Sequence, residues 1–121
     1  MTDTTTYSLE SFLVNVKQQE HSIDFEQVMQ VIKDNYQYQP TSFTNGKLIN
    51  ESGTNEGSCK IFYFAKLNKL SPQQTLACFG RYYRDDVLAN PNGNDHGNIR
   101  NFMQTGWQGI DFTSVALLPI E

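Results

Sequence analysis

Apolar residues recur at helical spacing along most of this chain, and that pattern constrains the fold more than any other feature of the sequence. The recurring positions are three and four residues apart, which places them on one face of a helix. The segments that show this spacing are 9–16, 25–36, 71–89 and 98–105. We therefore expect amphipathic helices in these segments, each with one face turned to a shared core.

Local signals mark where several of these helices begin and end. Asp24 stands before the second segment, and Gln27 follows it at the spacing of a capping box. Ser71-Pro72-Gln73-Gln74 begins the third segment with a cap, a proline at the first helical position and an amide at the third. Gly106 suits the residue that ends the last helix.

Residues 59–70 are apolar on all sides, so periodicity does not separate a central helix from a buried strand over 60–67. The length of this segment and the flanking Lys66 and Lys69 favour a helix. We therefore expect a fifth helix here. A further apolar piece, residues 110–118, lies near the end of the chain.

Residues 37–58 differ from the rest of the chain, because they are polar and rich in asparagine and glycine. Asn45-Gly46 is the strongest turn signal in the sequence, and only a short hairpin fits around it. A loop-like stretch of about 20 residues is uncommon in a small domain unless function or side-chain hydrogen bonds order it.

The fold class that follows is mainly α. We expect a single compact domain over 1–121, with about five helices around an aromatic core, a long Asn/Gly-rich loop and one small β-hairpin at most. An α+β arrangement is the alternative if 60–67 is a strand. Residues 1–7 are polar and are expected to be frayed. A chain of 121 residues is long enough to bury such a core without disulfides.

Amides rather than charges supply much of the polarity of this chain. Charged residues make up 18% of it, below the usual quarter or so, while there are 11 asparagines and 10 glutamines. Seven of the asparagines fall in two turn-rich segments, at positions 45, 50, 55, 90, 92, 94 and 98. We expect side-chain hydrogen bonds to order the polar loops 43–58 and 90–98, with a polar cleft between them. The alternative is that each asparagine closes its own turn.

The candidate binding residues on and beside these loops carry amide, carboxylate, guanidinium and indole groups. They are Asn45, Asn50, Asn55, Glu56, Asn98, Arg100 and Trp107. Amide groups hold sugars, peptides or backbone segments without any net charge. The partner expected for such a surface is an unknown protein or a small polar ligand.

The net charge of −4 and the pI of about 5.0 disfavour general nucleic-acid binding, which needs basic charge. One stretch runs against this balance, because five cations and no acidic residue lie between Gly57 and Arg84. Its cations and aromatics are Lys60, Lys66, Lys69, Arg81 and Arg84, with Phe62, Tyr63, Phe64, Phe79, Tyr82 and Tyr83. Such interleaving is able to stack on nucleic acid. We expect instead a solvated basic face beside a buried aromatic core.

Several features predict a cytoplasmic setting without a membrane partner. No apolar run approaches the ~20 residues that cross a bilayer. Residues 1–10 lack the basic and apolar regions of a secretory signal. Cys59 and Cys78 both lie in apolar surroundings, and no CxxC occurs, so we expect two buried, reduced thiols.

Cys59, His96 and Asp95 are the candidates for catalysis. Cys59 follows Gly57-Ser58 at an expected helix start, where a thiol pKa falls and backbone amides are available to an oxyanion. His96, directly after Asp95, would be the base of a Cys/His hydrolase or transferase. The alternative is a buried thiol and a surface histidine. His21 and Glu56 do not complete a metal-ligand spacing with His96, so we expect no metal and no cofactor.

Several blocks of this sequence resemble the HopJ type III effector protein family. They are Tyr38-Gln39-Pro40, Phe43-Thr44-Asn45-Gly46, Asn55-Glu56-Gly57-Ser58-Cys59-Lys60, Thr75-Leu76-Ala77-Cys78-Phe79-Gly80, Tyr83-Arg84, Asp95-His96, Asn98-Ile99-Arg100, Phe102-Met103 and Gly106-Trp107. The match spans roughly 25–118. It implies a single HopJ-like domain and, by the family name, delivery into a host cell by a bacterial type III secretion system. The resemblance implies no catalytic mechanism.

Three functions are open at this point. The first is a non-enzymatic binding or effector-type module that uses the polar loops 43–58 and 90–98, with a host-cell target if the protein is secreted. The second is the small Cys/His hydrolase or transferase. The third is a housekeeping cytoplasmic protein. The oligomeric state does not follow from the sequence.

Overall fold

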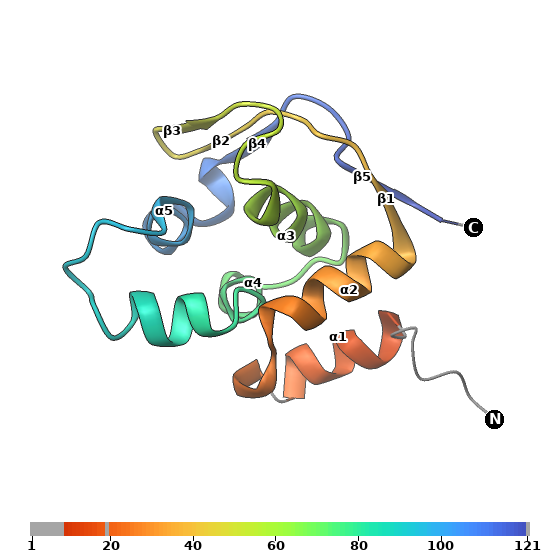
Figure 1. Cartoon of the computed structure of the whole chain (residues 1–121), viewed down its shortest axis with the longest axis horizontal. Helices are drawn as coiled ribbons and strands as arrows, with labels where there is room; N and C mark the ends of the chain where they lie inside the picture. The colour runs from red at the N-terminus through yellow and green to blue at the C-terminus, as the bar shows by residue number, and fades with distance from the viewer. Residues whose placement is uncertain (1–8, 19, 121) are drawn as a thin grey trace.

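Helix α3 (Glu56–Leu67) lies at the centre of the molecule, with the strands on one side, α1, α2 and α4 on the other, and α5 beside it (Figure 1). The structure is a computed structural model, and it describes residues 9–18 and 20–120. The expected fraying of residues 1–7 lies outside the described residues. Residues 60–67 belong to α3 and are therefore part of a central helix and not a strand. This helix buries Ile61, Phe62 and Phe64 completely.

The other helices follow the apolar spacing of the sequence. They are α1 (Leu9–Gln18), α2 (Phe25–Asn35), α4 (Pro72–Ala77) and α5 (Gly97–Thr105), with short 3-10 turns η1 (Glu20–Ser22) and η3 (Gly106–Gly109). The capping box at Ser71 forms as the sequence predicts: Ser71 Oγ accepts from the Gln74 backbone N–H at 3.1 Å, and Gln74 Oε1 accepts from the Ser71 N–H at 2.9 Å. Gly106 ends α5 with φ +59°.

The single helix predicted over 71–89 is wrong, because the chain breaks at Gly80. This residue has φ +59°, and a Cβ there would lie 2.7 Å from the backbone nitrogen of Phe25. Glycine is therefore needed both for the left-handed backbone and for the close approach of α2. Beyond the break the chain forms a π-helix, η2 (Tyr82–Val87), in which the Leu88 N–H donates to the Tyr83 carbonyl at 2.9 Å. π-helical turns are often found at functional sites.

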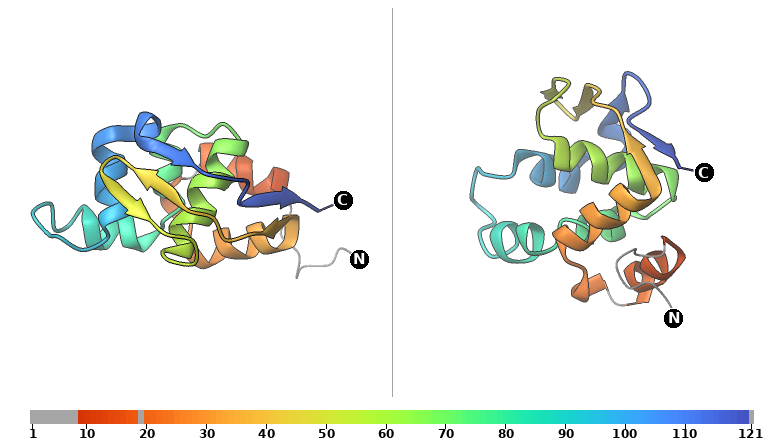
Figure 2. Two further views of the ribbon diagram at one scale, coloured as in Figure 1. Left: turned by 90° about the horizontal axis from the view of Figure 1, so that it is seen from above. Right: turned by 45° about the vertical axis from the view of Figure 1, so that its right-hand side comes forward.

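The mainly α prediction is also wrong, and the α+β alternative fits. Two small antiparallel sheets cover α3: β1 (Tyr36–Tyr38) pairs with β5 (Leu117–Pro119), and β2 (Phe43–Asn45) pairs with β3 (Leu48–Asn50) and β4 (Ile110–Phe112). The predicted hairpin around Asn45-Gly46 is present as β2–β3, with Gly46 at φ +63°. The polar loop and the terminal apolar piece thus become strands by pairing with each other (Figure 2).

The core is aromatic, and its centre is Phe62. The Phe62 ring lies 5.4 Å from Phe79, 5.0 Å from Phe102 and 6.0 Å from Phe43, measured between centroids. All four side chains are buried, and burying each contributes roughly 1.5–3 kcal/mol. Helices and strands are thereby fixed to α3. None of the helices in residues 9–18 and 20–120 has the length and apolar character needed to cross a bilayer.

Candidate functional site

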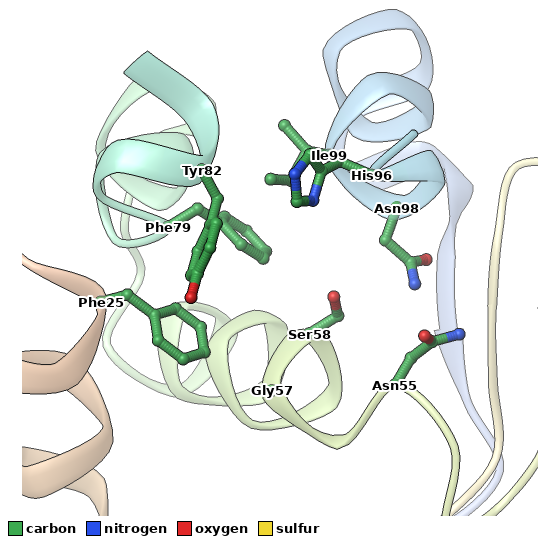
Figure 3. Close-up of a pocket in the computed structure, with 9 residues that line it drawn as sticks. All are labelled: Phe25, Asn55, Gly57, Ser58, Phe79, Tyr82, His96, Asn98 and Ile99. Carbon is green, nitrogen blue, oxygen red and sulfur yellow. The ribbon is translucent and has the colours of Figure 1, made fainter. Parts of the chain in front are cut away.

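A pocket of about 320 Å³ lies where the first turns of α3 and α5 face the π-helix η2 (Figure 3). Its lining is Phe25, Asn55, Gly57, Ser58, Phe79, Tyr82, His96, Asn98 and Ile99. The pocket therefore lies between the ends of the two asparagine-rich segments, 43–58 and 90–98. This is the place where the sequence predicts a polar cleft.

One wall of the pocket is aromatic. The Tyr82 ring meets Phe25 edge-on at 5.1 Å and lies 5.5 Å from the His96 ring. Phe25 in turn packs on Gly57, where a Cβ would approach the Phe25 ring to 2.9 Å. The absence of a side chain at Gly57 thus lets the Phe25 ring lie beside Tyr82 in this wall, as Figure 3 shows.

The opposite wall rests on a network of asparagine side chains. Asn98 Oδ1 accepts from Asn45 Nδ2 at 3.0 Å and from Asn50 Nδ2 at 3.1 Å, and Asn98 Nδ2 donates to Asn50 Oδ1 at 2.9 Å. Asn55 Nδ2 donates to the same Asn50 oxygen at 2.7 Å. Asn45, Asn50 and Asn98 are at most 6% exposed, so these amides tie the hairpin β2–β3 to the start of α5.

Two backbone outliers flank the pocket. Asn55 (φ +48°) caps α3, and His96 (φ +52°) caps α5. A left-handed backbone is uncommon for residues with a Cβ, although asparagine and histidine adopt it more readily than most. Both helices therefore begin at the pocket with first-turn N–H groups, among them those of Gly57 and Ser58, that have no helical acceptor.

His96 is held by Asp86 rather than by its neighbour Asp95. His96 Nε2 lies 3.0 Å from Asp86 Oδ2 and 3.9 Å from Asp95 Oδ2. Asp95 instead accepts from Arg100, and this hydrogen bond with the guanidinium lowers the Asp95 pKa. Arg100 also donates to the Asn90 and Asp95 carbonyls, so it orders the 90–96 turn.

Of the seven predicted binding residues, only Asn55 and Asn98 line the pocket. Asn45 and Asn50 support these two from the interior, and Arg100, Glu56 and Trp107 lie outside the lining. Glu56 accepts from the Tyr38 hydroxyl at 2.8 Å on the exposed surface. Trp107 donates from Nε1 to the Leu70 carbonyl at 3.1 Å and packs edge-on against Phe102. The structure therefore gathers the asparagines and His96, while Glu56 and Trp107 stabilise neighbouring parts of the fold.

Cys59 lies in the core and not in the lining of the pocket. Its side chain is 1% exposed, and its thiol contacts the Thr41 carbonyl at 3.8 Å. Burial raises the pKa of Cys59 above its ordinary value, which disfavours the thiolate needed by a nucleophile. The second thiol, Cys78, is buried as well, and burial raises its pKa to about 12.

Residues 9–18 and 20–120 contain no group of three or more His, Cys, Asp and Glu side chains placed to hold a metal ion. The basic stretch between Gly57 and Arg84 also presents few rings for stacking, because Phe62, Phe64 and Phe79 are buried. Lys60 instead lies over the Tyr38 ring at 4.7 Å.

The sequence reasoning missed Asp86 and the aromatic wall. Both arginines of this helix bind elsewhere, because Arg81 pairs with Glu26 at 3.1 Å and Arg84 donates to the Ile23 carbonyl at 2.8 Å. The π-helix turns Asp86 towards His96 instead. No local sequence signal identifies that turn.

A family model described as HopJ type III effector protein matches residues 9–117. This chain belongs to that family. A crystal structure described as that of unknown function protein VPA0580 is 49% identical to this HopJ chain, with a TM-score of 0.95. The match covers 99% of this chain and 100% of the other. No curated protein matches this chain. The comparisons identify the family and the fold of this HopJ protein, and they assign no role to the pocket.

Proposed function

We propose that this HopJ family member is a non-enzymatic binding module and that the pocket between segments 43–58 and 90–98 is its recognition site. One observation carries the proposal: side chains from both segments, Asn55 and Ser58 from one and His96 and Asn98 from the other, line the same cavity. The buried asparagine network supports it, because a rigid frame keeps such a pocket open without a ligand.

The size and chemistry of the pocket favour a small ring. A volume of about 320 Å³ stands at the low end of small-molecule sites, which run from about 300 to 1,000 Å³. Phe25 and Tyr82, both half-buried, offer ring surface with the buried Phe79 beside them, while Ser58 and Asn55 offer polar groups at the other wall. A planar ring with polar substituents suits both walls.

Such a ring belongs to a small polar ligand or to a side chain of a partner protein. If the protein is delivered into a host cell, as the family name implies, the partner would be a host molecule.

The alternative of a Cys/His enzyme receives no support from the placement of Cys59, whose thiol is buried away from the pocket lining. The His96–Asp86 hydrogen bond is the one observation that favours any acid–base role. A binding role needs neither a thiolate nor an acid–base pair, and the aromatic and polar side chains of the pocket lining are sufficient for it.

Benzamide, a small ring with a polar substituent, tests the proposal in a titration followed by ¹H–¹⁵N NMR spectra of the whole chain. We expect the largest shifts at the backbone amides of Gly57, Ser58 and Gly97. Ser58→Leu fills the pocket and should abolish these shifts, because Ser58 points into the pocket and its hydroxyl has no hydrogen-bond partner to lose among the described residues. Ser52→Leu, at an exposed position of the same segment, is the matched control. Equal shifts in both variants would refute the proposed site.

A further inference from the structure

The asparagine network fixes the orientation of each amide in turn, starting from the backbone carbonyl of Asn98. Asn45 Nδ2 lies 2.8 Å from the Asn98 backbone oxygen, which only accepts hydrogen bonds. The atom of Asn45 that faces Asn98 is therefore the donor. It also lies 3.0 Å from Asn98 Oδ1, so this side-chain atom must be the acceptor.

The orientations of Asn50 and Asn55 follow from that of Asn98. Because Asn98 Oδ1 accepts, Asn98 Nδ2 is the group that meets Asn50 at 2.9 Å, and the Asn50 atom there must be its oxygen. That oxygen also meets Asn55 at 2.7 Å, which requires Asn55 to present its NH₂ group to Asn50. The remaining polar atom of Asn55, its carbonyl Oδ1, is then left to the pocket.

Figure 3 shows this arrangement, with the Asn55 oxygen on the side of Ser58 and the nitrogen turned away from the cavity. Asn55 Oδ1 has no hydrogen-bond partner in the part of the chain that the structure describes, and it is exposed on a side chain whose other end is anchored. It is thus an acceptor whose direction is set by three other residues, Asn45, Asn98 and Asn50, without a ligand.

Donors stand close to this acceptor along the chain. The Ser58 hydroxyl and the first-turn N–H groups of Gly57 and Ser58 belong to the same turn of α3. The charged groups near the pocket are already paired, Asp86 with His96 and Glu26 with Arg81. Among the described residues, the pocket lining contains no Asp, Glu, Lys or Arg side chain, so its free groups are the neutral Asn55 acceptor and the Ser58 and backbone donors. A neutral ligand with a donor and an acceptor side by side matches this set.

We propose that the ligand of this pocket is a neutral planar ring that carries an N–H donor beside an acceptor, as an aromatic carboxamide does, with its N–H bonded to Asn55 Oδ1. The inference rests on the proposed function and names its ligand class. Asn55 is then the residue that selects for the donor, while Phe25 and Tyr82 hold the ring.

Two probes that differ in the donor alone test this selection. Benzamide has the N–H groups, and N,N-dimethylbenzamide keeps the ring and the carbonyl without them. We expect the wild-type chain to bind benzamide about tenfold more tightly, because a bound ring without an N–H shields the Asn55 acceptor from water and leaves it unpaired. The dissociation constants come from the NMR shifts of Gly57, Ser58 and Gly97.

Asn55→Gly separates the hydrogen bond from the bulk of the two methyl groups. Glycine accepts φ +48° without strain, so the variant removes the acceptor and keeps the turn. We expect it to bind both probes with similar affinity. Asn92→Gly, at an exposed asparagine of the other segment, should keep the tenfold preference.

Each outcome decides between the two proposals. If wild type binds both probes equally, or if Asn55→Gly keeps the tenfold preference, the donor-selecting role of Asn55 is overturned while the pocket stands as a ring-binding site. If neither probe shifts the pocket amides at millimolar concentration, the proposed function itself fails, and the inference fails with it.

Discussion

Replacing Asn98 by alanine should destabilise the protein strongly, although the residue lies only at the start of a short helix. Its side chain takes part in three hydrogen bonds with two buried partners, Asn45 and Asn50. After truncation, Asn45 Nδ2 keeps the Asn98 backbone oxygen, and Asn50 Oδ1 keeps Asn55. Asn50 Nδ2 loses its acceptor while remaining on a side chain that is 1% exposed.

The magnitude follows from that orphaned donor. A buried polar group left without a partner costs about 1–3 kcal/mol, and the other lost hydrogen bonds add about 1 kcal/mol. We therefore expect Asn98→Ala to lower the free energy of unfolding by about 2–4 kcal/mol. Urea unfolding followed by circular dichroism measures this, with an unchanged m-value as the sign that the unfolded state is the same.

Asn92→Ala is the matched control, because Asn92 is an exposed asparagine of the same segment. Its effect should stay within about 0.5 kcal/mol, as for most surface substitutions. If Asn98→Ala differs from this control by less than about 0.5 kcal/mol, the network does not hold the two segments together, and the rigid frame of the pocket is refuted.

Three further predictions concern the rest of the fold. Gly80→Ala should lower the melting temperature well below that of Gly53→Ala, because both have positive φ but only Gly80 faces backbone atoms at 2.7 Å. Cys59 and Cys78 should react with a disulfide reagent at pH 8 far more slowly in the native protein than in urea, because burial raises both pKa values and leaves little thiolate; fast native labelling would contradict this. Glu26→Gln should leave the urea unfolding midpoint close to that of the wild type, since its ion pair with Arg81 is more than half exposed; a large drop in the midpoint would contradict this.

Local signals in the sequence were sufficient for most helices and for the β2–β3 hairpin, but not for the break at Gly80 or for strands β1, β4 and β5. The stripes over 9–16 and 25–36 and the capping box at Ser71 are encoded by neighbouring residues, and each forms as predicted. The strands are three residues long, so they contain no measurable alternation. β1 depends on β5, whose partner residues Tyr36 and Pro119 are far apart in the chain. Such pairing decides the fold class and leaves no local trace.

The candidate site was predictable in part for the same reason. The clustering of asparagines in two turn-rich segments pointed to both sides of the pocket. That Asn50 and Asn98 bond to each other in the interior, instead of closing their own turns, depends on the hairpin meeting α5. Asp86 escaped prediction because a π-helix, rather than the expected α-helix, sets the direction of its side chain.

The most direct test of the account is a crystal structure of this chain soaked with benzamide. We expect the ring in the pocket against Phe25 and Tyr82, with the amide nitrogen within hydrogen-bond distance of Asn55 Oδ1. A pocket that holds water alone at saturating benzamide would contradict the ring-binding site. A ring bound there with its amide turned away from Asn55 would contradict the role of the oriented acceptor.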